Sequence, residues 1–216
     1  MALKIVAPTI LTSSPAEYKE IIKRYYPFAK RVHIDISDAT LAPTTTITPA
    51  HIWWPKGWTV DVHMMTATPS KYLEVLLKLH PNLVIFHAEA KEDLLPTMEK
   101  LQQSGIKVGV CIIKNIYPGN IKTILDAADH ALIFSGSLGQ YGGEADLLLL
   151  EKADLIQQGH PDIEIGWDGG ANVDNIRHIA QGGVSVVNVG SALAKADNPQ
   201  AVFEKLSTEI DNEEPF

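Results

Sequence analysis

Eight short apolar runs alternate with longer amphipathic stretches along the whole chain, and this alternation constrains the fold more than any other feature of the sequence. The runs are rich in Val and Ile and are bounded by Gly, Pro or Asp, which is the pattern of buried strands. The expected strands are Lys4–Ile10, Arg31–Ile36, Thr59–Met64, Leu83–His87, Lys107–Ile113, His130–Phe134, Ile163–Trp167 and Val184–Val189. The expected helices are Ser14–Tyr26, Ser70–His80, Glu92–Ser104, Asn120–Ala128, Glu144–Gln158, Asn172–Gln181 and Pro199–Glu209.

Strands that alternate with helices in this way form a parallel sheet with right-handed crossover connections. Eight such units in 216 residues favour an α/β fold, a single (β/α)8 TIM barrel, and an open doubly wound sheet is the alternative. No linker or low-complexity tract interrupts the pattern. We therefore expect one barrel domain over residues 1–210 and a short acidic tail over residues 211–216.

The charge balance is acidic, with 26 Asp and Glu residues against 18 Lys and Arg residues. This balance argues against nucleic acid as a partner, because a phosphate backbone requires a basic face. It does not argue against a small phosphorylated ligand, since backbone N–H groups can hold one phosphate without a basic side chain.

The sequence also indicates a cytoplasmic protein with no membrane partner. Cys111 is the single cysteine and lies in an apolar run, so we expect a buried free thiol in a reducing compartment. No apolar stretch reaches the roughly 20 residues that a membrane helix needs. The first residues have the length of a strand and are broken by Pro8, which does not fit a signal peptide.

Four metal-binding side chains stand at the ends of expected strands. His33 and Asp35 alternate along the second strand and therefore share one face of it. His63 ends the third strand and Asp168 follows the seventh. In a barrel these ends meet on one rim, so two imidazoles and two carboxylates form a candidate site for Zn²⁺, Fe²⁺, Mn²⁺ or Co²⁺.

Glycine-rich turns follow the last three expected strands: Gly142-Gly143, Gly169-Gly170 and Gly190-Ser191. Glycine lets the backbone approach a ligand closely, and successive N–H groups can form an anion site. Barrels often bind phosphate after strands seven and eight. A single pair of this kind would be explained better by a tight turn, but three such pairs on neighbouring loops favour a phosphate site. We also expect Asn172 to cap the helix that follows Gly170.

Several segments together resemble ribulose-phosphate 3-epimerases over nearly the whole chain. The matching motifs are Ala7-Pro8-Thr9-Ile10-Leu11, Val32-His33-Ile34-Asp35 with Asp38, Asp61-Val62-His63-Met64-Met65, Phe86-His87-Ala88-Glu89-Ala90, Trp167-Asp168-Gly169-Gly170 and Gly190-Ser191-Ala192. Thr9 stands where the family usually has Ser.

The resemblance implies a divalent metal ion held by His33, Asp35, His63 and Asp168, with Asp35 and Asp168 as the acid/base pair. The chemistry agrees, because epimerisation beside a carbonyl needs two bases on opposite faces of an ene-diolate and a Lewis acid at its oxygens. Thr9 and Met65 would then contact substrate, although plain core packing explains Met65 equally well. The resemblance also implies a homo-oligomer, either a dimer or a hexamer.

Two loops depart from the family pattern. Ser37-Asp38-Ala39 replaces the usual residues on either side of that aspartate, and the sixth loop, Ser135–Glu144, keeps Tyr141-Gly142-Gly143 but lacks the usual Asn-Pro-Gly and ends in Glu144. Both loops would touch the substrate, so the departures bear on its identity more than on the reaction.

Three hypotheses follow. The first is a metal-dependent 3-epimerase that interconverts D-ribulose 5-phosphate and D-xylulose 5-phosphate. The second is an epimerase for a six-carbon ketose phosphate such as allulose 6-phosphate, and the third is a barrel that binds a sugar phosphate without turnover. A Schiff base at Lys114 is disfavoured, because no other aldolase feature accompanies that residue.

Overall fold

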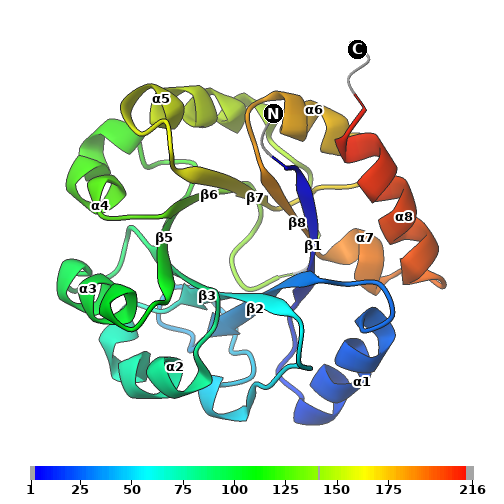
Figure 1. Cartoon of the computed structure of the whole chain (residues 1–216), viewed down its shortest axis with the longest axis horizontal. Helices are drawn as coiled ribbons and strands as arrows, with labels where there is room; N and C mark the ends of the chain where they lie inside the picture. Colours follow the sequence, from blue (N-terminus) through cyan, green and yellow to red (C-terminus); the bar gives the residue numbers. More distant parts are fainter. Residues whose placement is uncertain (1–2, 141, 213–216) are drawn as a thin grey trace.

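The computed structural model describes residues 3–140 and 142–212, and it is a closed eight-stranded barrel with helices outside it (Figure 1). The strands are β1 (Ile5–Ile10), β2 (Arg31–Ser37), β3 (Thr59–Met65), β4 (Leu83–His87), β5 (Lys107–Ile112), β6 (His130–Phe134), β7 (Glu164–Asp168) and β8 (Val186–Val189). All neighbouring pairs are parallel, and β8 pairs with β1. The predicted barrel is therefore confirmed, and the open sheet is excluded.

The helices that surround the barrel are α1 (Pro15–Tyr25), α2 (Leu73–Leu79), α3 (Leu95–Gln103), α4 (Lys122–Asp126), α5 (Glu151–Gly159), α6 (Ile176–Gln181), α7 (Ser191–Ala194) and α8 (Pro199–Ile210). Four 3₁₀ turns accompany them: η1 (Pro49–His51), η2 (Pro69–Tyr72), η3 (Pro118–Ile121) and η4 (Leu147–Leu150). Ser14 caps α1 by accepting a hydrogen bond from the Glu17 backbone, and Pro15 lies in the first turn.

Two expected helices begin at least four residues before the observed helix. The stretch predicted from Glu144 is loop and 3₁₀ turn until α5 begins at Glu151, and the stretch predicted from Asn172 is turn until α6 begins at Ile176. Asn172 is not the cap of α6: its Oδ1 accepts from the Asp174 backbone and so closes a local turn. In both places the chain is used to build the loops above the barrel.

Strand register determines which side chains enter the barrel. Because neighbouring strands are in register, the partners His33↔Asp61 and Asp35↔His63 project to the same side. The interior face continues around the ring and includes an apolar group made of Leu83, Ile85, Cys111, Leu132 and Phe134. The alternate residues face the helices and form the main core, so both faces of the sheet are buried.

The end of the barrel at which the strands begin is closed by an ion network. Arg31 Nε donates to Asp61 at 2.6 Å, and its two terminal nitrogens donate to the Glu164 carboxylate at 2.9 and 2.7 Å. Glu164 also lies 2.8 Å from His130 Nδ1. Asp61 is 1% exposed, so its charge depends on Arg31 for compensation.

The lowered pKa of Glu164 should make the stability of the protein depend on pH. Burial works to raise its pKa, but hydrogen bonds from Arg31 and His130 outweigh it and hold the pKa well below its usual range. A carboxyl group whose pKa is lower in the folded than in the unfolded protein stabilises the fold at pH values above its unfolded-state pKa. This stabilisation is lost as the pH falls below that value. Urea unfolding of wild type should therefore weaken more between about pH 6 and about pH 3 than that of Glu164→Gln. Parallel losses in the two proteins would contradict this.

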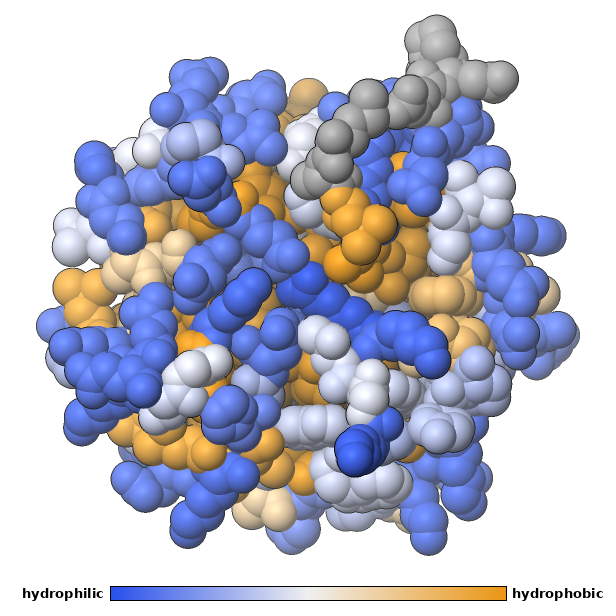
Figure 2. All heavy atoms as spheres, viewed as in Figure 1, coloured by the Kyte–Doolittle hydropathy of each residue, from blue (hydrophilic) through white to orange (hydrophobic). Residues whose placement is uncertain are grey.

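The face in Figure 2 is covered mostly by hydrophilic side chains, with apolar ones gathered in patches between them. Within residues 3–140 and 142–212, no helix has the length and apolar character needed to cross a bilayer. The predicted acidic tail falls largely on residues 213–216, which lie outside the described part of the chain.

Candidate active site and metal centre

The structure brings together all four predicted metal ligands. His63 Nδ1 lies 2.9 Å from Asp35 Oδ1, and His33 Nε2 lies 3.3 Å from the same oxygen. Asp168 Oδ2 lies 3.7 Å from His33 Nε2 and 3.9 Å from His63 Nδ1. Each residue offers one donor atom within 4.8 Å of the other three.

Their convergence follows from the strand register. Asp35 of β2 stands opposite His63 of β3, and His33 lies two residues earlier on the same face of β2. Asp168 is the last residue of β7, on another side of the ring. Both imidazoles are fully buried, whereas Asp35 and Asp168 border a cavity at the barrel mouth.

The two aspartates have pKa values shifted in opposite directions. Burial raises the pKa of Asp168 to about 7, and the negative charge of Asp35 adds to this effect. Burial also works to raise the pKa of Asp35, but hydrogen bonds from His33 and His63 outweigh it and hold that pKa well below its usual range. Burial and mutual repulsion therefore favour an ionised Asp35 beside an Asp168 that takes up a proton more readily.

The histidines differ as well. Burial lowers the pKa of His63 to about 4, so this ring is neutral and offers a nitrogen lone pair. Burial also disfavours the charged form of His33, but Asp35 and Asp168 outweigh it and raise its pKa.

The donor set fits a divalent metal ion. Neither ring nitrogen of the buried His33 has a well-aligned hydrogen-bond partner in the described part of the chain, although Nε2 points between two carboxyl oxygens. Ligand atoms about 2.0–2.2 Å from a common ion lie roughly 3–4.5 Å apart, which matches the separations found here. Two imidazoles and two carboxylates suit Zn²⁺, Fe²⁺, Mn²⁺ and Co²⁺ alike.

A cavity lies above the cluster, at the carboxyl ends of the strands. It is lined by Thr9, Asp35, Met65, Phe134, Gly136, Ser137, Gly139, Gln140, Gly142, Asp168, Gly169, Gly170, Ala171, Asn188, Gly190 and Ser191. Seven of the eight predicted substrate contacts are in this lining, whereas Gly143 is exposed on the loop after β6. Their contact with substrate stays a prediction, and Tyr141 lies outside the described residues.

Sequence reasoning missed Asn188. It occupies the middle of the otherwise apolar β8, opposite Asp168 in register, and is 2% exposed. Its Oδ1 faces the cavity region without a hydrogen-bond partner among the described residues. A polar side chain inside so short an apolar strand was the signal that could have identified it.

The loops after β6 and β7 interlock over the site. Gly169 and Gly170 have φ values of 114° and 71°, and a Cβ on either would collide with the backbone of the β6 loop, at Gly136 and Ala145 respectively. Ser135 N donates to Asp168 O at 2.7 Å. These contacts place Gly136, Gly169 and Gly170 in the cavity wall, and the exposed Glu144 is not part of the lining.

The altered second loop has a structural explanation. Asp38 accepts hydrogen bonds from the side chains of Thr40, Thr66 and Tyr72, so it fixes the loop after β2 rather than facing the cavity. The loop reaches across the mouth, where Thr44 Oγ1 donates to Gly139 O at 2.7 Å. The loop that follows Ser37-Asp38-Ala39 therefore contacts the altered sixth loop.

Lys114 and Cys111 take no part in the cavity lining. Lys114 pairs with Asp146 at 2.7 Å on the surface, and its side chain is 72% exposed. Cys111 is a buried free thiol, as predicted.

Comparison with known proteins gives one consistent result. A model described as the "Ribulose-phosphate 3 epimerase family" matches residues 5–194. Similar proteins named ribulose-phosphate 3-epimerase include one from Helicobacter pylori, 28% identical with 93% of this chain and 95% of the relative covered. Another, from Escherichia coli K12, is 26% identical with 95% and 96% covered. One from Schizosaccharomyces pombe is 24% identical with 95% and 93% covered.

Solved structures share the fold at lower identity. The 3-hexulose-6-phosphate synthase from Salmonella typhimurium superposes with a TM-score of 0.73 at 16% identity, covering 97% of this chain and 98% of that one. The phosphoribosyl anthranilate isomerase from Thermococcus kodakaraensis gives 0.66 at 11% identity, with 97% and 100% covered. At this identity the likeness shows the barrel fold alone.

Proposed function

Because the chain belongs to the ribulose-phosphate 3-epimerase family, and is thus a carbohydrate epimerase acting on a ketose phosphate, we propose that it interconverts D-ribulose 5-phosphate and D-xylulose 5-phosphate. The observation that carries this proposal is the pair Asp35 and Asp168, which reach one cavity from β2 and from β7 with opposite pKa shifts. Inversion at a carbon beside a carbonyl requires such a pair, one group on each face.

Asp35, which is ionised, can accept the proton on carbon 3 from one face. Asp168 can return one on the other face. Burial raises its pKa, whereas a bound cation would favour its carboxylate form, so it would hold that proton only transiently. The reverse reaction uses the same two groups in exchanged roles. His33 and His63 hold Asp35 in place through their contacts with its Oδ1.

The proposal includes a divalent metal ion held by His33, Asp35, His63 and Asp168. When bound, the ion supplies a Lewis acid for the negative charge that develops on the substrate oxygens. Support comes from the four converging donor atoms and from the buried His33 Nε2, which lies between Asp35 and Asp168 without a well-aligned hydrogen bond among the described residues.

We place the phosphate against the backbone of the three glycine turns, near Gly142, Gly170 and Gly190, which line the cavity. Backbone N–H groups can satisfy a phosphate without a basic side chain, which suits an acidic protein. A six-carbon ketose phosphate is the second candidate substrate. It is kept because the altered sixth loop lines the cavity at Gly139, where it contacts Thr44 of the loop after β2.

The test is a substrate and metal panel. Chelator-treated protein should lose activity and regain it with at least one of Zn²⁺, Fe²⁺, Mn²⁺ or Co²⁺. We expect kcat/KM to favour ribulose 5-phosphate over allulose 6-phosphate by about tenfold or more, the scale of one extra CHOH unit in the pocket. A preference for the hexose phosphate would replace the first candidate with the second, and full activity in metal-free protein would refute the metal site.

A further inference from the structure

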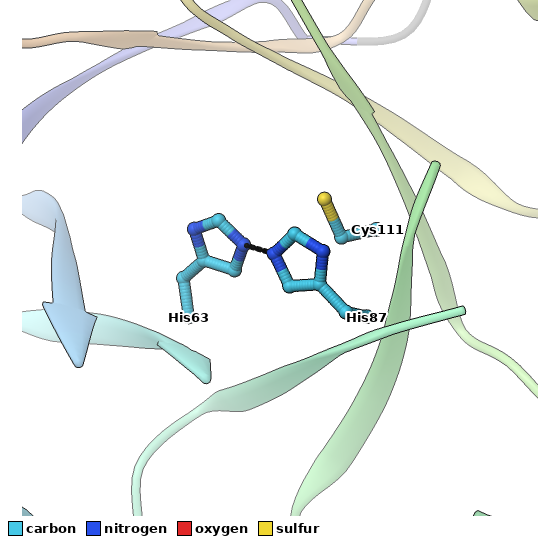
Figure 3. A group of neighbouring side chains, drawn as sticks. All are labelled: His63, His87 and Cys111. Carbon is cyan, nitrogen blue, oxygen red and sulfur yellow. Dashed lines mark hydrogen bonds between the residues drawn. The ribbon is translucent and has the colours of Figure 1, made fainter. Parts of the chain in front are cut away.

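A line of buried groups extends from the candidate metal site toward β4. His63 Nε2 lies 2.9 Å from His87 Nε2, on the side of the ring opposite the nitrogen that faces Asp35. The two imidazole planes differ by 13°, and Figure 3 shows the rings meeting edge to edge with Cys111 beside His87. His87 Nδ1 in turn lies 3.4 Å from Glu89 Oε2.

The strands position this line. His87 is the last residue of β4 and lies two residues after Ile85, the partner of His63, so it projects into the barrel with His63. Cys111 of β5 is the register partner of His87. All three side chains are fully buried, so the ring nitrogens depend on partners inside the barrel.

His63, His87 and Cys111 also form a group of potential metal ligands, with donor atoms within 4.8 Å of one another. The orientation of the two rings decides against a second ion between the histidines. Their Nε2 atoms face each other, and two nitrogens that face each other across one metal at about 2.0–2.1 Å would be about 4 Å apart. The nearly coplanar contact at 2.9 Å has the length of an N–H···N hydrogen bond.

A hydrogen bond between two Nε2 atoms requires one proton between them. If His63 Nδ1 is to bind a metal, it must present a lone pair, and the proton of this neutral ring then belongs on Nε2. His63 Nε2 donates to His87 Nε2 in that arrangement, and His87 carries its own proton on Nδ1. That nitrogen faces Glu89 Oε2, and both atoms lack a well-aligned partner within the described residues.

We propose that His87 and Glu89 are positioning residues that hold His63 in the tautomer whose Nδ1 is free to bind the metal. Without a metal the opposite arrangement is available, in which His63 Nδ1 donates to Asp35 and His87 Nε2 donates to His63. The acceptor oxygen of Glu89 favours the metal-binding arrangement, because it can accept a hydrogen bond from a proton on His87 Nδ1. This inference rests on the proposed metal site.

The test is Co²⁺ affinity of the metal-free protein, measured by visible absorption and chelator competition. We expect His87→Phe to weaken binding about 10–100-fold, the usual effect of removing the hydrogen-bond partner of a ligating histidine. His87→Gln keeps an acceptor near the Nε2 position and should rescue most of that loss. Cys111→Ala, a neighbouring truncation outside the line, should bind as wild type does.

The outcomes are distinct. Wild-type affinity in His87→Phe overturns the inference while leaving the proposed function intact. A loss in Cys111→Ala equal to that in His87→Phe also overturns it, in favour of a second metal site. If wild type binds no Co²⁺, the proposed metal site fails and the inference fails with it. If His87→Phe does not fold, Glu89→Ala serves instead, with several-fold weaker binding expected and unchanged affinity overturning the inference.

Discussion

Asp168→Asn is expected to lower kcat for epimerisation by about 10³-fold or more in both directions, at the upper end of what loss of one acid/base group costs. Asparagine preserves the size of the side chain but cannot carry the proton, and it weakens one metal ligand. Rates should be compared at saturating metal, with metal content measured for each protein. Asp174→Asn, an exposed change on the same loop, should leave kcat within about twofold.

Proton exchange separates the two aspartates. With Asp35 intact, Asp168→Asn should still exchange the carbon 3 hydrogen of one epimer with deuterium from heavy water while forming almost no product. Retention of more than about a tenth of wild-type kcat would remove Asp168 from the acid/base pair. Loss of exchange from both epimers, with metal still bound, would show that the two groups do not act on separate faces.

Arg31→Met is expected to lower the free energy of unfolding by about 3–5 kcal/mol, which is the usual cost of removing one partner of a buried ion pair. The change leaves Asp61, 1% exposed, with only the Asn82 amide as a side-chain hydrogen-bond donor in the described part of the chain. It also removes the two hydrogen bonds that Arg31 donates to the Glu164 carboxylate and leaves the contact of that carboxylate with His130. Urea denaturation at neutral pH measures the effect.

A second substitution tests the cause. Asp61→Leu in the Arg31→Met background should recover much of the loss, since an apolar pair can replace a buried ion pair at little cost. Lys23→Met, which breaks an exposed pair with Glu20, should change stability by less than about 0.5 kcal/mol. A loss in Arg31→Met as small as that of Lys23→Met would mean that the network contributes little.

The strands could be predicted closely because each is a short apolar run with a sharp end. The predicted Arg31–Ile36 differs from β2 by one residue, and Leu83–His87 coincides with β4. Helix starts could not be predicted as well, since Glu144 and the residues after it belong to a loop held by tertiary contacts. Among these, Asp146 N donates to the Ser135 hydroxyl at 2.7 Å. No local pattern encodes a contact of that kind.

The same distinction holds for the site. His33, Asp35, His63 and Asp168 were predictable because polar groups at strand ends stand out and the barrel brings those ends together. The contact between His63 and His87 could not be predicted, because it depends on how the register continues around the ring. Asn188 has a local signal in its apolar strand, but its position beside Asp168 also comes from the register. Phe86-His87-Ala88-Glu89 is visible in the sequence, but only the position of His87 beside His63 gives it a role.

Closure of the barrel through β8 and β1 has a consequence for synthesis on the ribosome. The edges of β1 and β7 stay unpaired until residue 189 has emerged, and at about 5–20 residues per second this takes roughly ten to forty seconds after β1 is made. During that time two open strand edges can pair with other nascent chains. Asp168 reaches His33 and His63 only as the ring shuts, so the candidate metal cluster forms through the same event that removes both edges.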